Sequence, residues 1–225
     1  MNKIHRNILE DLEAVRENLL SLSDDIWLSI DHNNTEEMNR GCSFKADYNE
    51  KMVAFDSIAT GISDVVQKFT NISLESKEEG GAGFETENDR IIRELNKEQP
   101  YGIEEDFTFR RPHGFILRGT AITGVVTWKR LYTRFCEALH RLDSGRFSGL
   151  PENEDHISSH GNSEFSRNRD DLREPVLIGD NVYAEGHNSA NSFRNSIKGL
   201  LQTFQIPSGE LQIFLREDRD AERQR

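Results

Sequence analysis

The residues with the clearest chemical potential are arginines grouped in the second half of the chain. Arginine is preferred where a planar, bidentate contact with phosphate or carboxylate is needed. Arg130 and Arg134 are one helical turn apart, as are Arg194 and Lys198, so each pair is expected to share a helix face. If these faces meet, they form a surface that contacts a nucleic-acid backbone without reading its sequence. The alternative is a solvated surface on which the arginines pair with nearby acids such as Glu137.

Two further segments carry polar side chains suited to an anion. In FSRNRDDLREP (165–175), Phe165 could stack on a base beside the arginines, or it could pin the loop to the core. Ser189 predicts the cap of the last helix, and the free N–H groups at such an end also suit a phosphate. The predicted ligand-binding residues are Arg130, Arg134, Arg167, Arg169, Arg173, Ser189, Asn191, Arg194 and Lys198.

Catalytic patterns are incomplete in this sequence. His156 and His160 have helical metal-ligand spacing, but their flanks indicate a loop and no third ligand is specified. Cys136 and His140 could pair as nucleophile and base, yet the apolar neighbours of Cys136 favour a core position. The carboxylates available to a metal-dependent nuclease are scattered around a predicted hairpin, at Asp171, Glu174, Asp180 and Glu185. We therefore expect no catalytic residue, no metal site and no cofactor.

Several of these motifs lie together in residues 107–219. They are a phenylalanine-rich strand before Arg118 and Gly119, WKRLY (128–132), FSRN (165–168), DLREP (171–175) and SANS (189–192). Together they resemble a module that recurs in bacterial proteins, some of them linked to defence or mobile elements. The resemblance covers about half the chain and implies a bacterial accessory or defence setting without an activity. The N-terminal segment resembles no named family.

Composition limits the elements that can position these residues. Hydrophobic residues are 35% of the 225, below the usual share of about 45–50%, which allows one modest core. No apolar run approaches the roughly 18 residues of a membrane span, and the N-terminus lacks a signal-peptide core. Two distant cysteines exclude a disulfide framework. The composition predicts a soluble, cytoplasmic protein without membrane contact.

The charge is distributed unevenly along the chain. The net charge is −12, but residues 1–106 contain 24 Asp and Glu against 11 Lys and Arg. Residues 107–225 contain 16 acids against 17 bases, of which 15 are arginine. This shift predicts two parts with different roles. The acidic half could mimic DNA, or it could consist of solvated helix faces, which the scattered placement of its acids favours.

Residues 1–73 predict an antiparallel, coiled-coil-like helical hairpin broken at 31–35, with Asn34 as the cap and Glu37 as its capping-box partner. Apolar residues follow 4–3 spacing from Ile8 to Ile26 and from Phe44 to Phe69, which indicates a heptad seam. Because a lone hairpin buries only one seam, we expect self-association into a four-helix arrangement. The predicted oligomerisation residues are Leu12, Val15, Leu19, Leu22, Met52, Phe55, Ile62 and Val66.

The rest of the chain is expected to hold a linker, one domain and a tail. Residues 74–106 predict an acidic, glycine-containing linker with one short helix around Ile91, ended by Pro100. Residues 107–219 predict an α+β domain of order ββαββαβ, with helices capped by Thr127 and Ser189 on one antiparallel sheet. Residues 145–168 are expected to form a long polar loop, and residues 220–225 a charged tail.

These patterns favour a non-enzymatic factor that oligomerises through its N-terminal helices. Its arginine-rich module would contact a nucleic-acid backbone, DNA or RNA, or another phosphate ligand. The first alternative is a protein–protein adaptor whose arginines meet an acidic partner. The second is a metal-dependent nuclease or other hydrolase without a standard motif.

Overall fold

The computed structural model describes residues 2–71, 84–157, 163–179 and 181–216. The chain divides into two compact units, Met1–Glu79 and Gly80–Arg225, each described by itself below. The expected tail, the first ten residues of the expected linker, His160 and Asp180 lie outside the described residues. Within the described ranges, no helix is long and apolar enough to cross a membrane.

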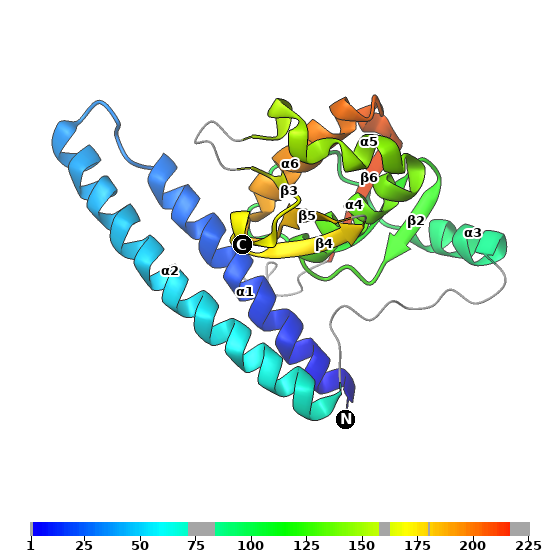
Figure 1. Cartoon of the computed structure of the whole chain (residues 1–225), viewed down its shortest axis with the longest axis horizontal. Helices are drawn as coiled ribbons and strands as arrows, with labels where there is room; N and C mark the ends of the chain where they lie inside the picture. The colour runs from blue at the N-terminus through cyan, green and yellow to red at the C-terminus, as the bar shows by residue number, and fades with distance from the viewer. Residues whose placement is uncertain (1, 72–83, 158–162, 180, 217–225) are drawn as a thin grey trace. The chain divides into compact units, whose positions relative to one another are not determined.

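The first unit is an antiparallel pair of long helices (Figure 1). Helix α1 spans Asn2–Leu28 and α2 spans Thr35–Thr70. The Asn34 side chain caps α2 by accepting hydrogen bonds from the backbone N–H groups of Glu36 and Glu37, at 3.0 and 3.3 Å. The predicted break and cap are therefore confirmed. The predicted capping-box pairing is wrong, because the Glu37 carboxylate accepts from the N–H of Asp31 at 3.3 Å, while the N–H of Asn34 donates to the Asp31 carbonyl.

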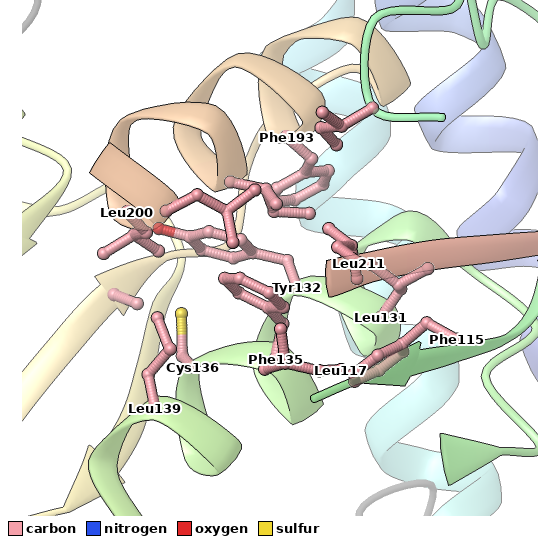
Figure 2. Close-up of a cluster of buried hydrophobic side chains, with 14 of the residues drawn as sticks. Phe115, Leu117, Leu131, Tyr132, Phe135, Cys136, Leu139, Phe193, Leu200 and Leu211 are labelled. Carbon is pink, nitrogen blue, oxygen red and sulfur yellow. The ribbon is translucent and has the colours of Figure 1, made fainter. Parts of the chain in front are cut away.

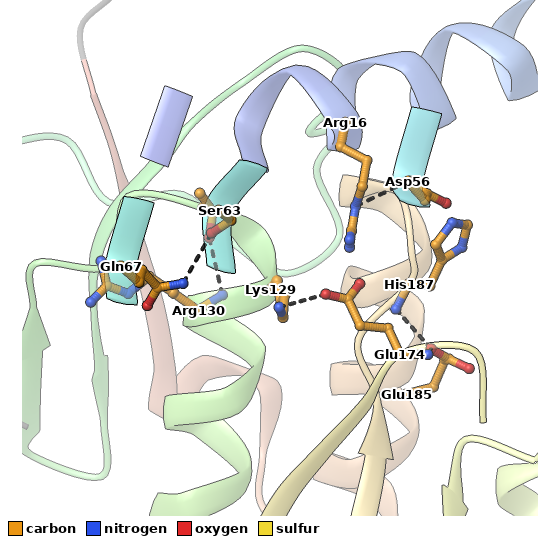
Figure 3. A network of polar contacts seen from close by, with 10 residues as sticks. Arg16, Asp56, Ser63, Gln67, Lys129, Arg130, Glu174, Glu185 and His187 are labelled. Atoms are coloured by element: carbon orange, nitrogen blue, oxygen red, sulfur yellow. Dashed lines mark hydrogen bonds and ion pairs between the residues drawn. The ribbon is translucent and has the colours of Figure 1, made fainter. Parts of the chain in front are cut away.

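Contacts between α1 and α2 define the interhelical seam. Tyr48 Oη donates a hydrogen bond to the Leu19 carbonyl at 2.9 Å, and Arg16 Nε lies 3.9 Å from Asp56 Oδ1 (Figure 3). Lys45 Nζ donates to Ser23 Oγ at 2.7 Å. Polar and charged side chains thus occupy positions that an apolar coiled-coil seam would fill.

The predicted seam differs from the observed one by a rotation of α1. Val15 and Leu22 are exposed, at 43% and 36% of their surfaces, and Ile62 on α2 is 50% exposed. The residues directly after the first two, Arg16 and Ser23, make the contacts with α2 instead. Of the other predicted oligomerisation residues, Met52 is buried and the rest are partly buried, namely Leu12, Leu19, Phe55 and Val66.

The second unit mixes helices with two small antiparallel sheets, which confirms the α+β class. Its helices are α3 (Phe84–Leu95), α4 (Trp128–Leu142), α5 (Ser144–Ser148) and α6 (Ala190–Thr203). Its strands are β1 (Pro112–Leu117), β2 (Thr120–Thr123), β3 (Phe165–Ser166), β4 (Pro175–Gly179), β5 (Val182–Glu185) and β6 (Leu211–Leu215). The strand orders are β2-β1-β6 and β3-β5-β4, so the single predicted sheet is wrong.

Local sequence signals place most of these elements. Thr127 and Ser189 cap α4 and α6 as predicted, by accepting hydrogen bonds from backbone N–H groups three residues ahead. Arg118 and Gly119 have positive φ, 49° and 76°, and form the two-residue turn between β1 and β2. Asn181, with φ of 61°, belongs to the predicted turn between β4 and β5.

One hydrophobic core joins α4, α6 and residues of both sheets. Figure 2 shows Tyr132 and Phe135 of α4 packed between Phe193 of α6 and Phe115 of β1. Phe115, Phe135 and Phe193 are fully buried. Burying a side chain of this size contributes about 1.5–3 kcal/mol, so this cluster supplies much of the stability of the unit.

The segment expected to be a linker is part of this second unit. Leu95 of α3 is buried against Ile116 and Phe214, on the opposite face of the β1–β6 sheet from the main core. Asn88 binds the edge of β2: its amide donates to the Gly119 carbonyl at 3.0 Å and accepts from the N–H of Ala121 at 2.9 Å. Residues 84–106 are therefore folded, unlike the predicted linker.

Two other expectations fail in the second unit. The phenylalanine-rich strand predicted before Arg118 does not include Phe107 and Phe109: β1 begins at Pro112, Phe109 adopts a φ of 57° and is 46% exposed, and Phe107 is buried. The predicted polar loop at 145–168 contains α5 and two short 3₁₀ helices, Leu150–Glu152 and Glu154–His156. Phe147 and Leu150 within it are buried, which anchors it to the core.

Candidate functional site

Two of the predicted phosphate-binding arginines, Arg134 and Arg167, pair with nearby acids. Arg167 contacts both carboxylate oxygens of Glu152 (2.6 and 3.2 Å) and donates to the Ser148 carbonyl. Its hydrogen bonds lower the pKa of Glu152. Arg134 Nη1 lies 3.0 Å from Glu137, the acid that the sequence suggested as a partner for the arginines. These contacts favour the solvated, ion-paired surface over a shared phosphate-binding face.

The two basic residues of α6 are tied to the loop before β1. Arg194 Nη1 donates to the Glu105 carbonyl at 2.8 Å, and Lys198 forms an ion pair with Glu104. Arg134 and Arg194 thus bind different segments, and their contacts do not join them into one cluster. Arg130 lies on α4, one turn before Arg134.

At the N-terminus of α6, the predicted anion-binding residues make internal contacts. Ser189 caps the helix, and Asn191 Nδ2 donates to Asp106 Oδ1 (2.7 Å) and Thr108 Oγ1 (2.8 Å). The side-chain oxygen Oδ1 of Asn191 accepts from the N–H of Phe107 at 3.0 Å. Hydrogen bonds from Thr108 and then Asn191 lower the pKa of Asp106 to about 2. The Asn191 side chain therefore binds a carboxylate of the chain itself, Asp106.

The loop that contains the FSRN and DLREP motifs is fixed by its own side chains. Ser166 Oγ donates to Asp171 Oδ2 at 2.6 Å, and Asn168 Nδ2 donates to Asp171 Oδ1 at 3.1 Å. Phe165 is buried in the core, so the pinning role considered for it is confirmed. The polar side chains of these two motifs therefore shape the loop.

Three of the carboxylates considered for nuclease chemistry, Asp171, Glu174 and Glu185, serve the fold. Glu185 accepts hydrogen bonds from the backbone N–H groups of Arg173, Glu174 and His187 at 2.8–3.0 Å, one of them visible in Figure 3. The Glu174 carboxylate lies 2.7 Å from Lys129 Nζ (Figure 3). Within the described residues, no group of three His, Cys, Asp or Glu side chains is placed to hold a metal ion.

A buried histidine network, which sequence reasoning missed, connects the 3₁₀ helix Glu154–His156 to α6. His156 is 2% exposed; its Nδ1 lies 3.1 Å from Glu164 Oε2 and its Nε2 lies 2.9 Å from Thr203 Oγ1. Ser196 Oγ donates to the other Glu164 oxygen at 2.7 Å. Thr203, His156 and Glu164 follow the hydroxyl–imidazole–carboxylate order of a hydrolase. However, the ring is buried and both of its nitrogens already have partners. The arrangement therefore fulfils the hydrogen-bonding needs of a buried histidine.

Cys136 occupies the core position that its neighbours predict. It is fully buried, and burial raises the pKa of its thiol well above the usual range. A thiol held in its neutral form is a poor nucleophile. His140, one turn later, packs edge-on against Phe147 with ring centroids 5.5 Å apart.

A shallow groove of about 280 Å³ runs beside β6. Its lining includes Tyr101, Ile103, Leu211 and Gln212, and Tyr101 extends the sheet by exchanging two backbone hydrogen bonds with Ile213. The acid in its lining is Glu104, the ion-pair partner of Lys198. The described lining of this groove therefore offers apolar surface and does not place a nucleophile beside a general base.

Comparisons of this chain with known proteins identify no similar protein. No family model, curated protein or solved structure matches this chain.

Proposed function

We propose that this chain is a non-enzymatic, self-associating adaptor, in which the hairpin joins copies and the second unit contacts a protein partner. The observation that carries the proposal is the exposure of large apolar side chains on the hairpin. They are Ile4, Ile8, Val15, Leu22, Leu28, Val53, Ile58, Ile62, Val65 and Phe69. Large exposed apolar patches mark interaction sites.

The chemistry of the second unit supports the non-enzymatic part of the proposal. Its candidate acids, bases and nucleophiles hold the fold together, as Asp106, Glu185 and His156 illustrate. The proposal includes a cytoplasmic location, no membrane contact and the bacterial accessory or defence setting that the resemblance implies.

Light scattering on the purified full chain over a wide concentration range tests the self-association. The expected mass is at least twice the 25.9 kDa of one chain. Affinity purification of the full chain with mass spectrometry then identifies the protein partner. A mass of one chain at all concentrations would overturn the proposal.

A phosphate ligand, including a nucleic-acid backbone, is a second candidate because of two arginines. Arg169 and Arg173 are exposed on the loop fixed by Asp171 and Glu185. Within the part of the chain that the structure describes, their guanidinium groups form no ion pair. A rigid loop presenting two guanidinium groups suits phosphate oxygens.

Fluorescence anisotropy with labelled DNA and RNA over a salt series tests this candidate. Binding should weaken linearly in log salt, and Arg169→Glu with Arg173→Glu should abolish it. Arg167→Gln is the matched control, because Arg167 is already paired with Glu152. Absence of binding at low salt would contradict the candidate and leave the adaptor proposal standing.

A further inference from the structure

The C-terminal half of α2 presents an uncharged stripe to solvent. The stripe consists of Ala54, Ile58, Gly61, Ile62, Val65 and Phe69, all exposed. The four large members range from 50% exposed at Ile62 to 89% at Phe69. At about 100° per residue, the six positions fall within an arc of roughly 100° around the helix. This arc is wide enough for a helix to pack against it.

Helix α1 adds apolar residues on the same side of the hairpin. Ile8 and Val15 directly precede seam positions of α1, and Ile58 directly precedes the buried Ala59 of α2. An antiparallel helix pair is related by a two-fold axis normal to the plane of the two helices, so equivalent flanking positions lie on one side. Ile8 and Val15, 59% and 43% exposed, therefore widen the α2 stripe.

The spacing of the α2 stripe is a palindrome. Successive members are separated by 4, 3, 1, 3 and 4 residues, symmetric about the bond between Gly61 and Ile62. An antiparallel partner helix with the same sequence, aligned on that point, therefore meets the stripe position for position. A two-fold symmetric dimer requires such a self-complementary surface.

Residue sizes in this alignment are complementary. Phe69 faces Ala54 of the second copy, and Ile62 faces Gly61 of the second copy, so the largest side chains meet the smallest. Val65 faces Ile58 of the second copy. A Cβ added at Gly61 would meet nothing within 4 Å, so the space that Ile62 of the second copy needs is open.

The exposed area is of the size that a stable dimer needs. At roughly 100 Å² for each large side chain, the four on α2 with Ile8 and Val15 provide on the order of 600 Å² of apolar surface. Stable interfaces bury about 800 Å² per partner, including their polar rim. The stripe therefore supplies the apolar part of such an interface.

We propose that a second copy of this chain covers the α2 stripe, with the two α2 helices antiparallel and a two-fold axis between Gly61 and Ile62. This inference rests on the proposed function, because it assumes that the chain self-associates. Beyond the proposed function, the inference specifies which surface the two copies share and in which register their α2 helices align.

Cysteine cross-linking of the full chain tests the register. In a Cys42→Ser background, which removes the exposed cysteine, one sample carries Ile58→Cys and the other Val65→Cys. After mixing, subunit exchange and mild oxidation, the antiparallel register predicts a cross-link between the two variants, distinguished by a mass tag on one of them. Glu50→Cys, exposed but outside the stripe, replaces Ile58→Cys as the matched control and should give no cross-link.

The outcomes separate the register from the proposed function. A selective cross-link between positions 58 and 65 supports the inference. Links of each variant only with itself would indicate parallel helices and overturn it. A dimeric mass by light scattering without any cross-link would also overturn it while leaving the adaptor proposal intact, whereas a monomeric mass would overturn both.

Discussion

The two units of this chain use apolar and charged residues in opposite ways. In the second unit, phenylalanines such as Phe115 and Phe135 are fully buried, and Arg134 and Arg167 pair with neighbouring acids. In the hairpin, Arg16 lies in the seam while Phe69 is 89% exposed. The second unit thus buries most of its described aromatic side chains, and the hairpin leaves apolar surface for another molecule. This contrast indicates that association belongs to the hairpin, and it can be tested from each side.

The largest expected effect concerns where the second unit begins. A fragment of residues 84–225 should fold, whereas residues 107–225 should not, because that fragment lacks Leu95 against Phe214 and the pairing of Tyr101 with Ile213. Dispersion of amide signals in ¹H–¹⁵N NMR spectra measures the outcome. Equal dispersion in both fragments would show that the second unit folds without residues 84–106 and would contradict the prediction.

The same substitution in each unit should have different consequences. Phe135→Ala should destabilise the second unit by about 3–5 kcal/mol, because it leaves a cavity. Phe69→Ala should weaken self-association, and at concentrations where the copies have dissociated it should change the stability of the hairpin by less than about 0.5 kcal/mol. Urea unfolding compares them, with Trp128 fluorescence in a Trp27→Phe background for the second unit and far-UV circular dichroism for the hairpin. Similar losses of unfolding free energy in the two variants would contradict the contrast between a buried Phe135 and an exposed Phe69.

A smaller effect is expected at the contact between α6 and the loop before β1. Asn191→Ala should destabilise the second unit by about 1–3 kcal/mol, because it removes one hydrogen-bond donor to Asp106 and the acceptor of the Phe107 N–H. Urea midpoints measure the loss. Arg169→Ala, on an exposed side chain of the same unit, is the control and should leave the midpoint unchanged. A ligand-binding role for Asn191 would instead leave the stability of the free protein unaltered.

The smallest effect is a pH dependence. Because the pKa of Asp106 is about 2 in the folded state, its carboxylate stabilises the fold above pH 4, and this contribution disappears as the pH falls toward 2. Since Asp106 is exposed, the contribution should stay below about 1 kcal/mol. Between pH 5 and pH 2 the wild type should lose more stability than Asp106→Asn, as measured by urea midpoints. Parallel losses would contradict the assignment.

Local signals in the sequence predicted the elements well. The caps at Asn34, Thr127 and Ser189 and the turn at Gly119 follow from side-chain hydrogen bonding and positive φ, which depend on a few neighbouring residues. These caps and this turn are therefore determined by residues within about one helical turn, which the sequence alone reveals.

Features that depend on distant partners were not predictable. Ile91 and Leu95 indicated a short helix, but nothing local shows that it packs on the β1–β6 sheet. Likewise, Glu164 and Thr203 lie 8 and 47 residues from His156 and meet only in the fold. On α1, Ile8, Val15 and Leu22 match a heptad seam as well as the true positions do, because hydrophobic spacing does not distinguish an internal seam from an external one.

The central claim, that apolar residues on one side of the hairpin join copies of the chain, is tested most directly by a matched pair of variants. Ile62 and Val53 are both exposed, at 50% and 71%, but lie about 180° apart around α2. Sedimentation equilibrium on the full chain should give a single-chain mass for Ile62→Glu and the wild-type oligomer for Val53→Glu. If both variants keep the wild-type mass, or if both lose it, the claim is contradicted.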